Sequence, residues 1–391
     1  MLGERIKQFR LAEGLSLDAL VAKMGGVVTK QAISKYELGK TRPSPRTLTS
    51  LARALGIKTV HLLESPLKSI NFIAYRKRTT FSKTEQTQLE NKVKCLLEDR
   101  VRMQGIVGIK NKEELPIQSL RIKEINDVEN VAQLLRKRWR LGDDAISSVV
   151  DTLEDHLIHV LEIEANEKFD GIAAIAIDDQ KDILASAVVT RNVECGERQR
   201  FNLAHEIGHL VLKVSENVDE EKAAFRFAGA FLVPKEVLIK EIGAKRTTIA
   251  LEELFLLKKR FGISIQALLY RLKDLEIISK IYYTQWFKVL TRVSWRKSEP
   301  HPLEKENPQW LKRNSLKAVS EGVMTKDRAE KILGEKIEYD NALSLVNKMS
   351  FMKLPMKERR RLMTEQANKL KSHYEEEVRN NNIGGGNLVE Y

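Results

Sequence analysis

Two histidines four residues apart, with a glutamate directly after the first, are the clearest candidates for chemistry in this chain. They lie in the stretch RFNLAHEIGHLVL, residues 201–213, as His205, Glu206 and His209. The apolar residues around them recur with a helical period, and on a helix residues i and i+4 face the same way. Two imidazoles on one face can share a metal ion, and the Glu206 carboxylate can take a proton from a metal-bound water. Because glycine disfavours a helix interior by about 1 kcal/mol, Gly208 predicts that another element approaches this turn closely.

A catalytic zinc ion takes three protein ligands and leaves a fourth position for water, so the histidine pair needs one more ligand. A second helical pattern, VDEEKAAFRFAGAFLVP at residues 218–234, begins with Glu220 and Glu221. A helix packed across the first could bring either carboxylate to the metal. The other histidines are scattered without such spacing and are interpreted as structural. The alternative to a metal centre is an ordinary amphipathic helix.

These two stretches resemble the ImmA/IrrE family of zinc metallopeptidases. The resemblance is carried by RQRFNLAHEIGHLVL and, downstream, by EEKAAFRFAGAFLVP. It implies Zn²⁺ as the cofactor, a gluzincin-like endopeptidase activity with Glu206 as the catalytic base, and Glu221 as the third ligand, six residues before a Phe-Ala pair. Glu220 is the fallback for that ligand. The chain departs from the family at Phe225, where Asn is common. Shorter matching stretches extend the resemblance over roughly residues 3–300.

Composition limits the classes of protein to which the chain can belong. Its 391 residues are 42% hydrophobic with a mean hydropathy of −0.34, which indicates two or three globular domains. No apolar run is long enough to span a membrane, and the N-terminal stretch lacks the core of a signal peptide, so we expect a cytoplasmic protein. Cys95 and Cys195 are interpreted as free thiols. The net charge of +13 and the isoelectric point near 9.5 indicate an acidic partner, most often nucleic acid.

Residues 1–65 predict a small all-helical bundle. Its helical stretches GERIKQFRLAEG, SLDALVAKM and TKQAISKYELGK have Ser16 and Thr29 at N-cap positions and glycines at their ends. The layout of residues 3–65 resembles the lambda-repressor/Cro-like (XRE) helix-turn-helix. That resemblance implies double-stranded DNA as a partner, with residues 29–38 as the recognition helix. The residues expected to meet base edges and phosphates are Thr29, Lys30, Gln31, Ser34, Lys35, Lys40 and Arg42. A module used only for dimerisation is the alternative.

Residues 66–275 predict the metallopeptidase domain, a zincin-like α+β domain with a small antiparallel sheet in a chain that is otherwise mainly α. A Ser-capped entry leads into a long amphipathic helix, and DVENVAQLLRKRWRLGDDAI and VVDTLEDHLIHVLEI are read as further helices. The runs GIAAIAIDD and KDILASAVVTRN predict two strands joined as a hairpin through DDQK. The outer edge of this hairpin could pair with an extended peptide beside the metal.

Residues 276–391 predict a helical C-terminal region. It begins with SEPHPLEKENPQW, a linker or ordered strap, and continues with a small helix-turn-helix-like unit, NSLKAVSEGVMTKDRAEKILG. The last amphipathic segment, 351–377, weakly resembles the helical segments of small antitoxins. It either docks on its own protein or forms an arm that captures a partner. Its charged KERRR run is either a solvated face or a binding site for an acidic partner.

Two functions follow from these patterns. In the first, the chain is a DNA-bound regulator whose zinc centre cleaves a peptide bond in a repressor, in a toxin or in the chain itself. In the second, it is a DNA-binding antitoxin or repressor that neutralises a cognate toxin without turnover. A pseudo-palindromic operator would be read by a homodimer.

Overall fold

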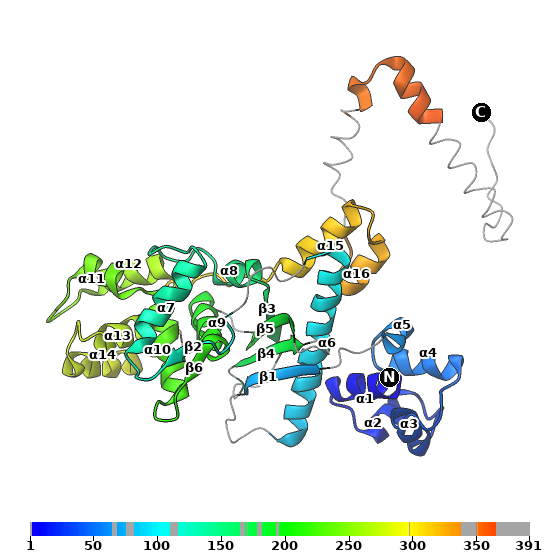
Figure 1. The fold of residues 1–391 in the computed structure, drawn as a ribbon, viewed down its shortest axis with the longest axis horizontal. Helices are drawn as coiled ribbons and strands as arrows, with labels where there is room; N and C mark the ends of the chain where they lie inside the picture. Colours follow the sequence, from blue (N-terminus) through cyan, green and yellow to red (C-terminus); the bar gives the residue numbers. More distant parts are fainter. Residues whose placement is uncertain are drawn as a thin grey trace. The chain divides into compact units, whose positions relative to one another are not determined.

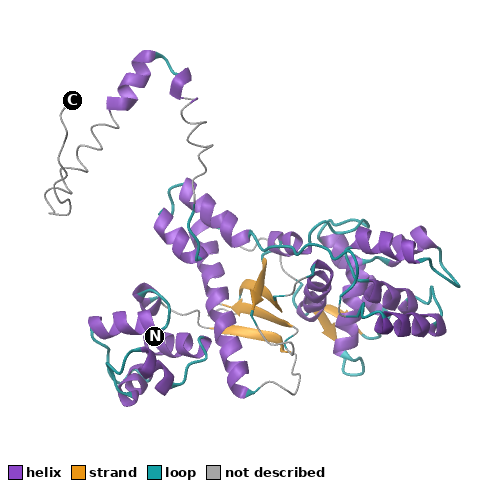
Figure 2. Cartoon of the chain, turned by 180° about the vertical axis from the view of Figure 1, so that it is seen from behind, coloured by secondary structure: helices purple, strands orange, loops and turns teal. Residues whose placement is uncertain are grey.

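The computed structural model describes residues 2–64, 69–75, 82–109, 116–164, 169, 171–177, 182–192, 195–296, 298–337, 349 and 351–364. Within these ranges the chain is mainly helical, as the sequence predicts, and it contains one four-stranded and one two-stranded sheet (Figure 1, Figure 2). Its contacts divide it into two units, Met1–Ile332 and Leu333–Tyr391. In the described ranges, no helix combines the length and the apolar character needed to cross a bilayer.

The N-terminal bundle consists of five helices. They are α1 (Leu2–Ala12), α2 (Leu17–Lys23), α3 (Lys30–Glu37), α4 (Pro45–Ala54) and α5 (Thr59–Leu63). The hydroxyls of Ser16 and Thr29 accept backbone N–H bonds of 3.0 and 3.2 Å, which confirms both predicted N-caps. Gly25 and Gly26 both have positive φ, a conformation that glycine adopts without strain, and they end α2 before the turn into α3. One cluster of buried aliphatic side chains, including Ile33 of α3, forms the core of this bundle.

The larger sheet contains four strands in the order β1-β4-β5-β3. They are β1 (Ser69–Tyr75), β3 (Ile158–Ile163), β4 (Gly171–Ile177) and β5 (Ile183–Arg191). Strands β4 and β5 pair antiparallel, which confirms the predicted strand pair, while the DDQK turn lies outside the described residues. Both outer edges of that pair are covered by other strands, so the predicted free hairpin edge is wrong; the edges of the sheet are β1 and β3.

The sheet is mixed rather than purely antiparallel, because β3 runs parallel to β5. The helical pattern predicted over residues 149–163 is wrong in its second half, because only α8 (Val149–Asp155) is helical and β3 follows it. Leu157, with a φ of 56°, lies in the turn between them. All but one residue of IHVLEI in β3 is buried, and parallel pairing with β5 along the whole strand overrides the apparent helical periodicity.

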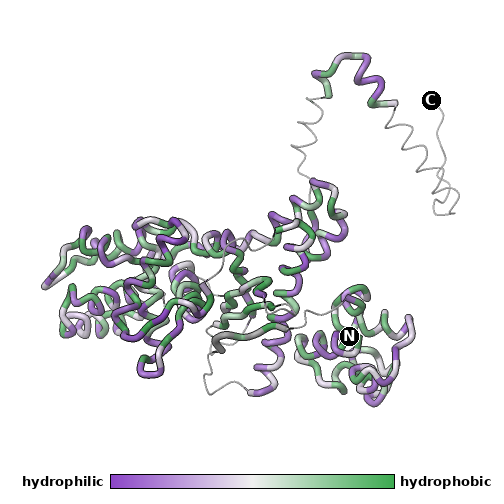
Figure 3. The backbone as a smooth tube through the Cα atoms, viewed as in Figure 1, coloured by the Kyte–Doolittle hydropathy of each residue, from purple (hydrophilic) through white to green (hydrophobic). Residues whose placement is uncertain are grey.

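Helices cover both faces of this sheet (Figure 1, Figure 2). On one face lies α6 (Lys83–Val107), which begins at the predicted Ser82 cap with a complete capping box and packs Leu89, Val93 and Leu97 against the strands. On the other face lies α9 (Gly196–Val211), which packs against β4 and β5. Strands β3–β5 are mostly hydrophobic along their length (Figure 3), as expected for a sheet buried on both sides.

The remaining elements contribute to the same hydrophobic core as α9. They are β2 (Leu120–Ile122) and β6 (Leu212–Val214), which form a parallel pair, and α7 (Asp127–Arg138), α10 (Glu220–Leu232), α11 (Lys235–Ile242), α12 (Leu251–Phe261), α13 (Ile265–Asp274) and α14 (Lys280–Arg292). The predicted helix-turn-helix-like unit forms α15 (Trp310–Ser320) and α16 (Lys326–Leu333). In the second unit, residues 356–364 are helical, and the rest of the proposed arm, from residue 365, lies outside the described residues.

The segment before α15, residues 298–309, is an ordered strap rather than a linker. The Gly196 N–H, at the start of α9, donates to the Leu303 carbonyl at 2.9 Å. Glu306 accepts from the Arg200 guanidinium at 2.5 Å and from the Val150 N–H at 2.8 Å. These contacts fix the N-terminal half of α9, and the candidate metal ligands His205 and His209 follow in the C-terminal half of the same helix.

Candidate metal centre and helix-turn-helix surface

Helix α9 carries the predicted metal-binding pair and is the most enclosed helix of the centre. Of its 16 residues, 13 are buried, so its polar side chains are removed from water and require partners. His205 and His209, each 4% exposed, lie on one face with ring centroids 4.8 Å apart. The sequence predicts this placement from helical geometry alone.

A close crossing of α9 and α10 brings the third candidate ligand to this face. A Cβ atom added at Gly208 would lie 3.1 Å from Ala224 Cα and 3.2 Å from the Phe227 ring. This is the close approach that a glycine in the middle of the helix predicts. Because α10 begins at Glu220, the crossing places the first turn of α10 beside the two imidazoles.

The candidate ligand atoms lie at separations that suit a tetrahedral metal ion. The Nε2 atoms of His205 and His209 are 3.1 Å apart, and they lie 3.5 and 3.4 Å from the two carboxylate oxygens of Glu221. Ligands about 2.0–2.1 Å from a tetrahedral zinc ion are about 3.3–3.4 Å from one another, so the three residues fit this ion. With two nitrogens and one carboxylate, the set has the composition of a catalytic rather than a structural zinc site.

The two glutamates of α10 face different atoms of the same histidine. Glu221 faces the inward Nε2 atoms, whereas Glu220 Oε1 lies 3.4 Å from His209 Nδ1. A carboxylate at the second ring nitrogen orients a ligating histidine and raises its basicity. The geometry therefore favours Glu221 over Glu220 as the third ligand and gives Glu220 a positioning role.

Glu206 lies beside this set, only 2% exposed. Its carboxylate fills the space next to Gly171 at the start of β4, where an added Cβ would be 2.3 Å from Oε1. Burial by itself lowers the pKa of His209, but Glu221, Glu206 and Glu220 together raise it above its usual value. The negative potential that favours a proton on this ring also favours a bound cation.

Aromatic side chains that the sequence analysis did not connect lie next to the metal ligands. The Phe225 ring, in the position of the family's common Asn, meets the His205 ring edge-on at 5.5 Å. It also lies 5.0 Å from the Phe201 ring and 6.0 Å from the Tyr270 ring. The departure at Phe225 was visible in the sequence, whereas its partner Tyr270 on α13 is brought there by the fold.

The second candidate site is the surface of α3. Its predicted contact residues lie on the exposed side of the bundle: Thr29, Lys30, Gln31, Lys35, Lys40 and Arg42 are exposed, and Ser34 is half-buried. The side-chain oxygen of Thr29 already accepts the α3 cap bond, and Lys30 Nζ lies 2.6 Å from Asp18 of α2. Such an exposed ion pair contributes little to stability and can exchange for a phosphate.

A helical bundle with an exposed third helix, followed by a His-Glu-His centre on crossed helices, defines the class of a helix-turn-helix protein with a metallopeptidase-like domain. Comparison with known families agrees. Residues 6–62 match the model of the Helix-turn-helix family, and residues 196–273 match that of the IrrE N-terminal-like domain. The chain thus carries an XRE-like DNA-binding domain and an ImmA/IrrE-like peptidase domain.

A curated relative matches the N-terminal part. It is the SPbeta prophage-derived uncharacterized HTH-type transcriptional regulator YonR of Bacillus subtilis (strain 168), 41% identical over 64 residues. The match covers 16% of this chain and 57% of that protein.

Proposed function

We propose that the chain is a transcriptional regulator whose zinc-dependent centre hydrolyses a peptide bond in a regulatory protein partner or in the chain itself. The observation that carries the proposal is the set of three inward ligand groups, in which the two Nε2 atoms are 3.1 Å apart and each lies 3.4–3.5 Å from one Glu221 oxygen, with the buried Glu206 carboxylate beside them. The helix-turn-helix bundle would hold this centre on operator DNA through α3.

His205, His209 and Glu221 would hold the zinc ion. When bound, zinc supplies Lewis acidity that makes water a nucleophile near neutral pH and polarises the scissile carbonyl. Glu206 accepts the proton of the attacking water and delivers it to the leaving amide nitrogen, so that water and peptide give a carboxylate and an amine. Because Gly171 has no side chain, the Glu206 carboxylate has space beside it, and Glu220 orients His209.

The test uses three variants of the full chain. Glu206→Gln should keep one equivalent of zinc and lose cleavage, because the carboxamide cannot accept the proton. The double variant His205→Ala, His209→Ala should lose the metal. Glu216→Gln, an exposed carboxylate in the turn after β6, is the matched control and should change neither property.

Zinc is measured by elemental analysis, and cleavage by mass spectrometry of a proteome-derived peptide library incubated with each variant. A full equivalent of zinc in the double histidine variant would refute the ligand assignment. Equal cleavage by Glu206→Gln and the unmodified chain would refute the mechanism. Zinc binding without cleavage of any peptide would favour the second class, a DNA-binding antitoxin that neutralises its partner without turnover.

A further inference from the structure

A row of aromatic rings leads away from the metal ligands over the surface of α13. It starts at His205, passes through Phe225 at 5.5 Å and reaches Tyr270 after a further 6.0 Å. Phe225 is 41% and Tyr270 36% exposed, so both rings offer apolar area to a ligand. Adjacent exposed rings beside a candidate metal ligand form a contiguous apolar surface of the kind that marks ligand-binding grooves.

The space between these rings is small and apolar. A cavity of about 20 Å³ lies between Phe201, Phe225 and Tyr270, with Gly229 and Ala267 among its lining residues. That volume holds little more than a water or a methyl group, so a larger side chain would lie against the ring faces instead of entering deeply.

The charged side chains that border the cavity between Phe201, Phe225 and Tyr270 neutralise one another. Arg226 lies 3.1 Å from Glu129 and 3.5 Å from Asp274, and Arg271 lies 2.6 Å from the same Glu129. These pairs leave no excess charge at the cavity, which suits an uncharged side chain.

Beyond Tyr270 the surface becomes basic. The Lys273 ammonium lies 4.0 Å from the centre of the Tyr270 ring and 5.5 Å from that of Tyr283. Lys273 also borders a cavity of about 680 Å³ between residues 245–247 and 276–280, which we call the basic cavity.

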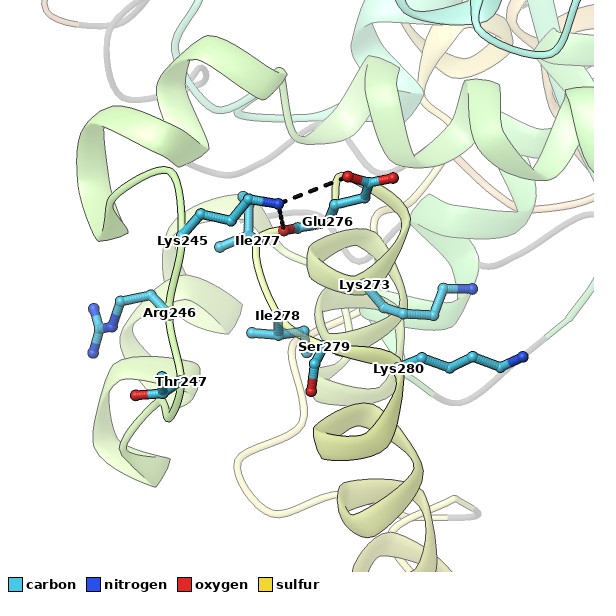
Figure 4. A pocket seen from close by; sticks show the side chains of 9 residues that line it. All are labelled: Lys245, Arg246, Thr247, Lys273, Glu276, Ile277, Ile278, Ser279 and Lys280. Atoms are coloured by element: carbon cyan, nitrogen blue, oxygen red, sulfur yellow. Dashed lines mark hydrogen bonds and ion pairs between the residues drawn. The ribbon is translucent and has the colours of Figure 1, made fainter.

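Figure 4 shows Lys273 and Lys280 at the border of the basic cavity, extending in the same direction and away from residues 245–247, while Lys245 turns toward Glu276. Lys245 Nζ donates to the Glu276 carbonyl at 2.7 Å and lies 3.7 Å from its carboxylate. Among the residues that the structure describes, neither Lys273 nor Lys280 is in an ion pair with a carboxylate. The basic cavity therefore carries a local excess of positive charge.

The aromatic row and the basic cavity are close enough for one ligand to span them. The contacts from His205 through Phe225 and Tyr270 to Lys273 are 5.5, 6.0 and 4.0 Å long. The ammonium is therefore within about 16 Å of the His205 ring, which about five residues of an extended peptide can cover.

We propose that this surface selects the substrate: an extended acidic peptide segment that places an aromatic or large aliphatic side chain on Phe225 and Tyr270, and carboxylates at Lys273 and Lys280. The inference rests on the proposed peptidase function. Apolar rings beside the metal ligands match a peptide side chain, and the unpaired ammonium groups match its acidic residues. Duplex DNA offers the charge but no side chain for the rings.

The test measures binding separately from cleavage, using the full-length, zinc-loaded chain in the Glu206→Gln background. The probes are three fluorescent peptides: one with a phenylalanine about four residues from a run of glutamates, one with alanine in place of that phenylalanine, and one with glutamines in place of the glutamates. Both orders of phenylalanine and glutamates are included, because the structure does not fix the direction of the peptide.

The first peptide should bind about 10-fold more tightly than the alanine peptide, as expected for an aromatic contact. It should bind several-fold more tightly than the glutamine peptide at low salt, with a difference that shrinks as salt rises. In Phe225→Asn the phenylalanine preference should disappear, and in Lys273→Glu, Lys280→Glu the glutamate preference should disappear. Lys288→Glu with Arg292→Glu, two charge reversals further along α14, should keep both preferences.

Equal binding of the three peptides, no binding of any, or the same loss in the Lys288→Glu, Arg292→Glu control would overturn the inference. Displacement of the acidic peptide by duplex DNA would also overturn the inference, because Lys273 and Lys280 would then bind DNA. Selective binding without cleavage by the unmodified chain would instead overturn the proposed peptidase function, and cleavage without either preference would overturn only this inference.

Discussion

Gly171 offers a test that separates the position of the proposed catalytic carboxylate, Glu206, from the stability of the fold. In Gly171→Ala the new Cβ atom would lie 2.3 Å from Glu206 Oε1 and 2.5 Å from its Cδ. Ordinary contacts between such atoms are about 3.5 Å, so the carboxylate must move by about 1 Å. Glu206 Cγ would also be close, at 2.7 Å, but all three atoms belong to one flexible side chain, which can move while the strand stays in place.

We expect this displacement to reduce kcat/KM by about 100-fold, since a 1 Å misplacement of a reacting group has about that effect. This corresponds to about 2.7 kcal/mol of transition-state stabilisation. The alanine also restricts the unfolded chain by about 0.4–1 kcal/mol, which partly offsets the new crowding. The free energy of unfolding should therefore change by less than about 2 kcal/mol, and one equivalent of zinc should remain bound.

The assay uses an internally quenched peptide made from a sequence that the unmodified chain cleaves, with zinc analysis and urea unfolding on the same preparations. Gly105→Ala is the matched control, because an added Cβ there has no neighbour within 4 Å in the described structure. In α6 it should stabilise the chain by up to about 1 kcal/mol and leave cleavage unchanged. Cleavage by Gly171→Ala within about threefold of the unmodified rate would refute the placement of Glu206, and loss of zinc or of the fold would show that Gly171 serves packing instead.

Three further predictions concern the rest of the chain. Affinity for a pseudo-palindromic operator should fall steeply with salt: a plot of log K against log salt concentration should have a slope near −3.5 per bundle for about four phosphate contacts. The double variant Gln31→Ala, Ser34→Ala should lower specific affinity about 10- to 100-fold without changing that slope, and gel-shift titrations measure both. Glu129→Gln should destabilise the chain by about 2–4 kcal/mol in urea unfolding at neutral pH, because it leaves the buried Arg271 without its carboxylate. Burial raises the pKa of Glu129, but the guanidinium groups of Arg271 and Arg226 together lower it more. This stabilisation is therefore fully present above the ordinary carboxyl pKa and is lost as pH falls through the lowered one. A difference between the two chains that persists in strong acid would contradict the assignment. Deletion of residues 345–391 should leave operator binding and zinc content intact, because both sites lie within Met1–Ile332. The same deletion should abolish capture of a partner in a pull-down, and unfolding or metal loss would contradict the idea of an arm.

The sequence by itself determined the features that depend on local spacing. The four-residue interval places His205 and His209 on one helical face, and the hydroxyl residues Ser16 and Thr29 cap the helices that they precede. Gly208 predicted a close helix crossing before any partner was known, because only such contact explains a glycine in the middle of a buried helix. Each of these conclusions needs only the geometry of one helix or one turn.

The tertiary structure decided what depends on elements far apart in the chain. It made Ile158–Ile163 a strand, because parallel pairing with β5 outweighs a local helical pattern. It distinguished the two adjacent glutamates of α10, since only the angle at which α10 crosses α9 turns Glu221 to the Nε2 atoms and Glu220 to Nδ1. It also aligned Phe225, Tyr270 and Lys273 into one surface beside the metal ligands. Periodicity cannot specify such contacts, because they arise from the packing of helices whose relative positions are set by the whole core.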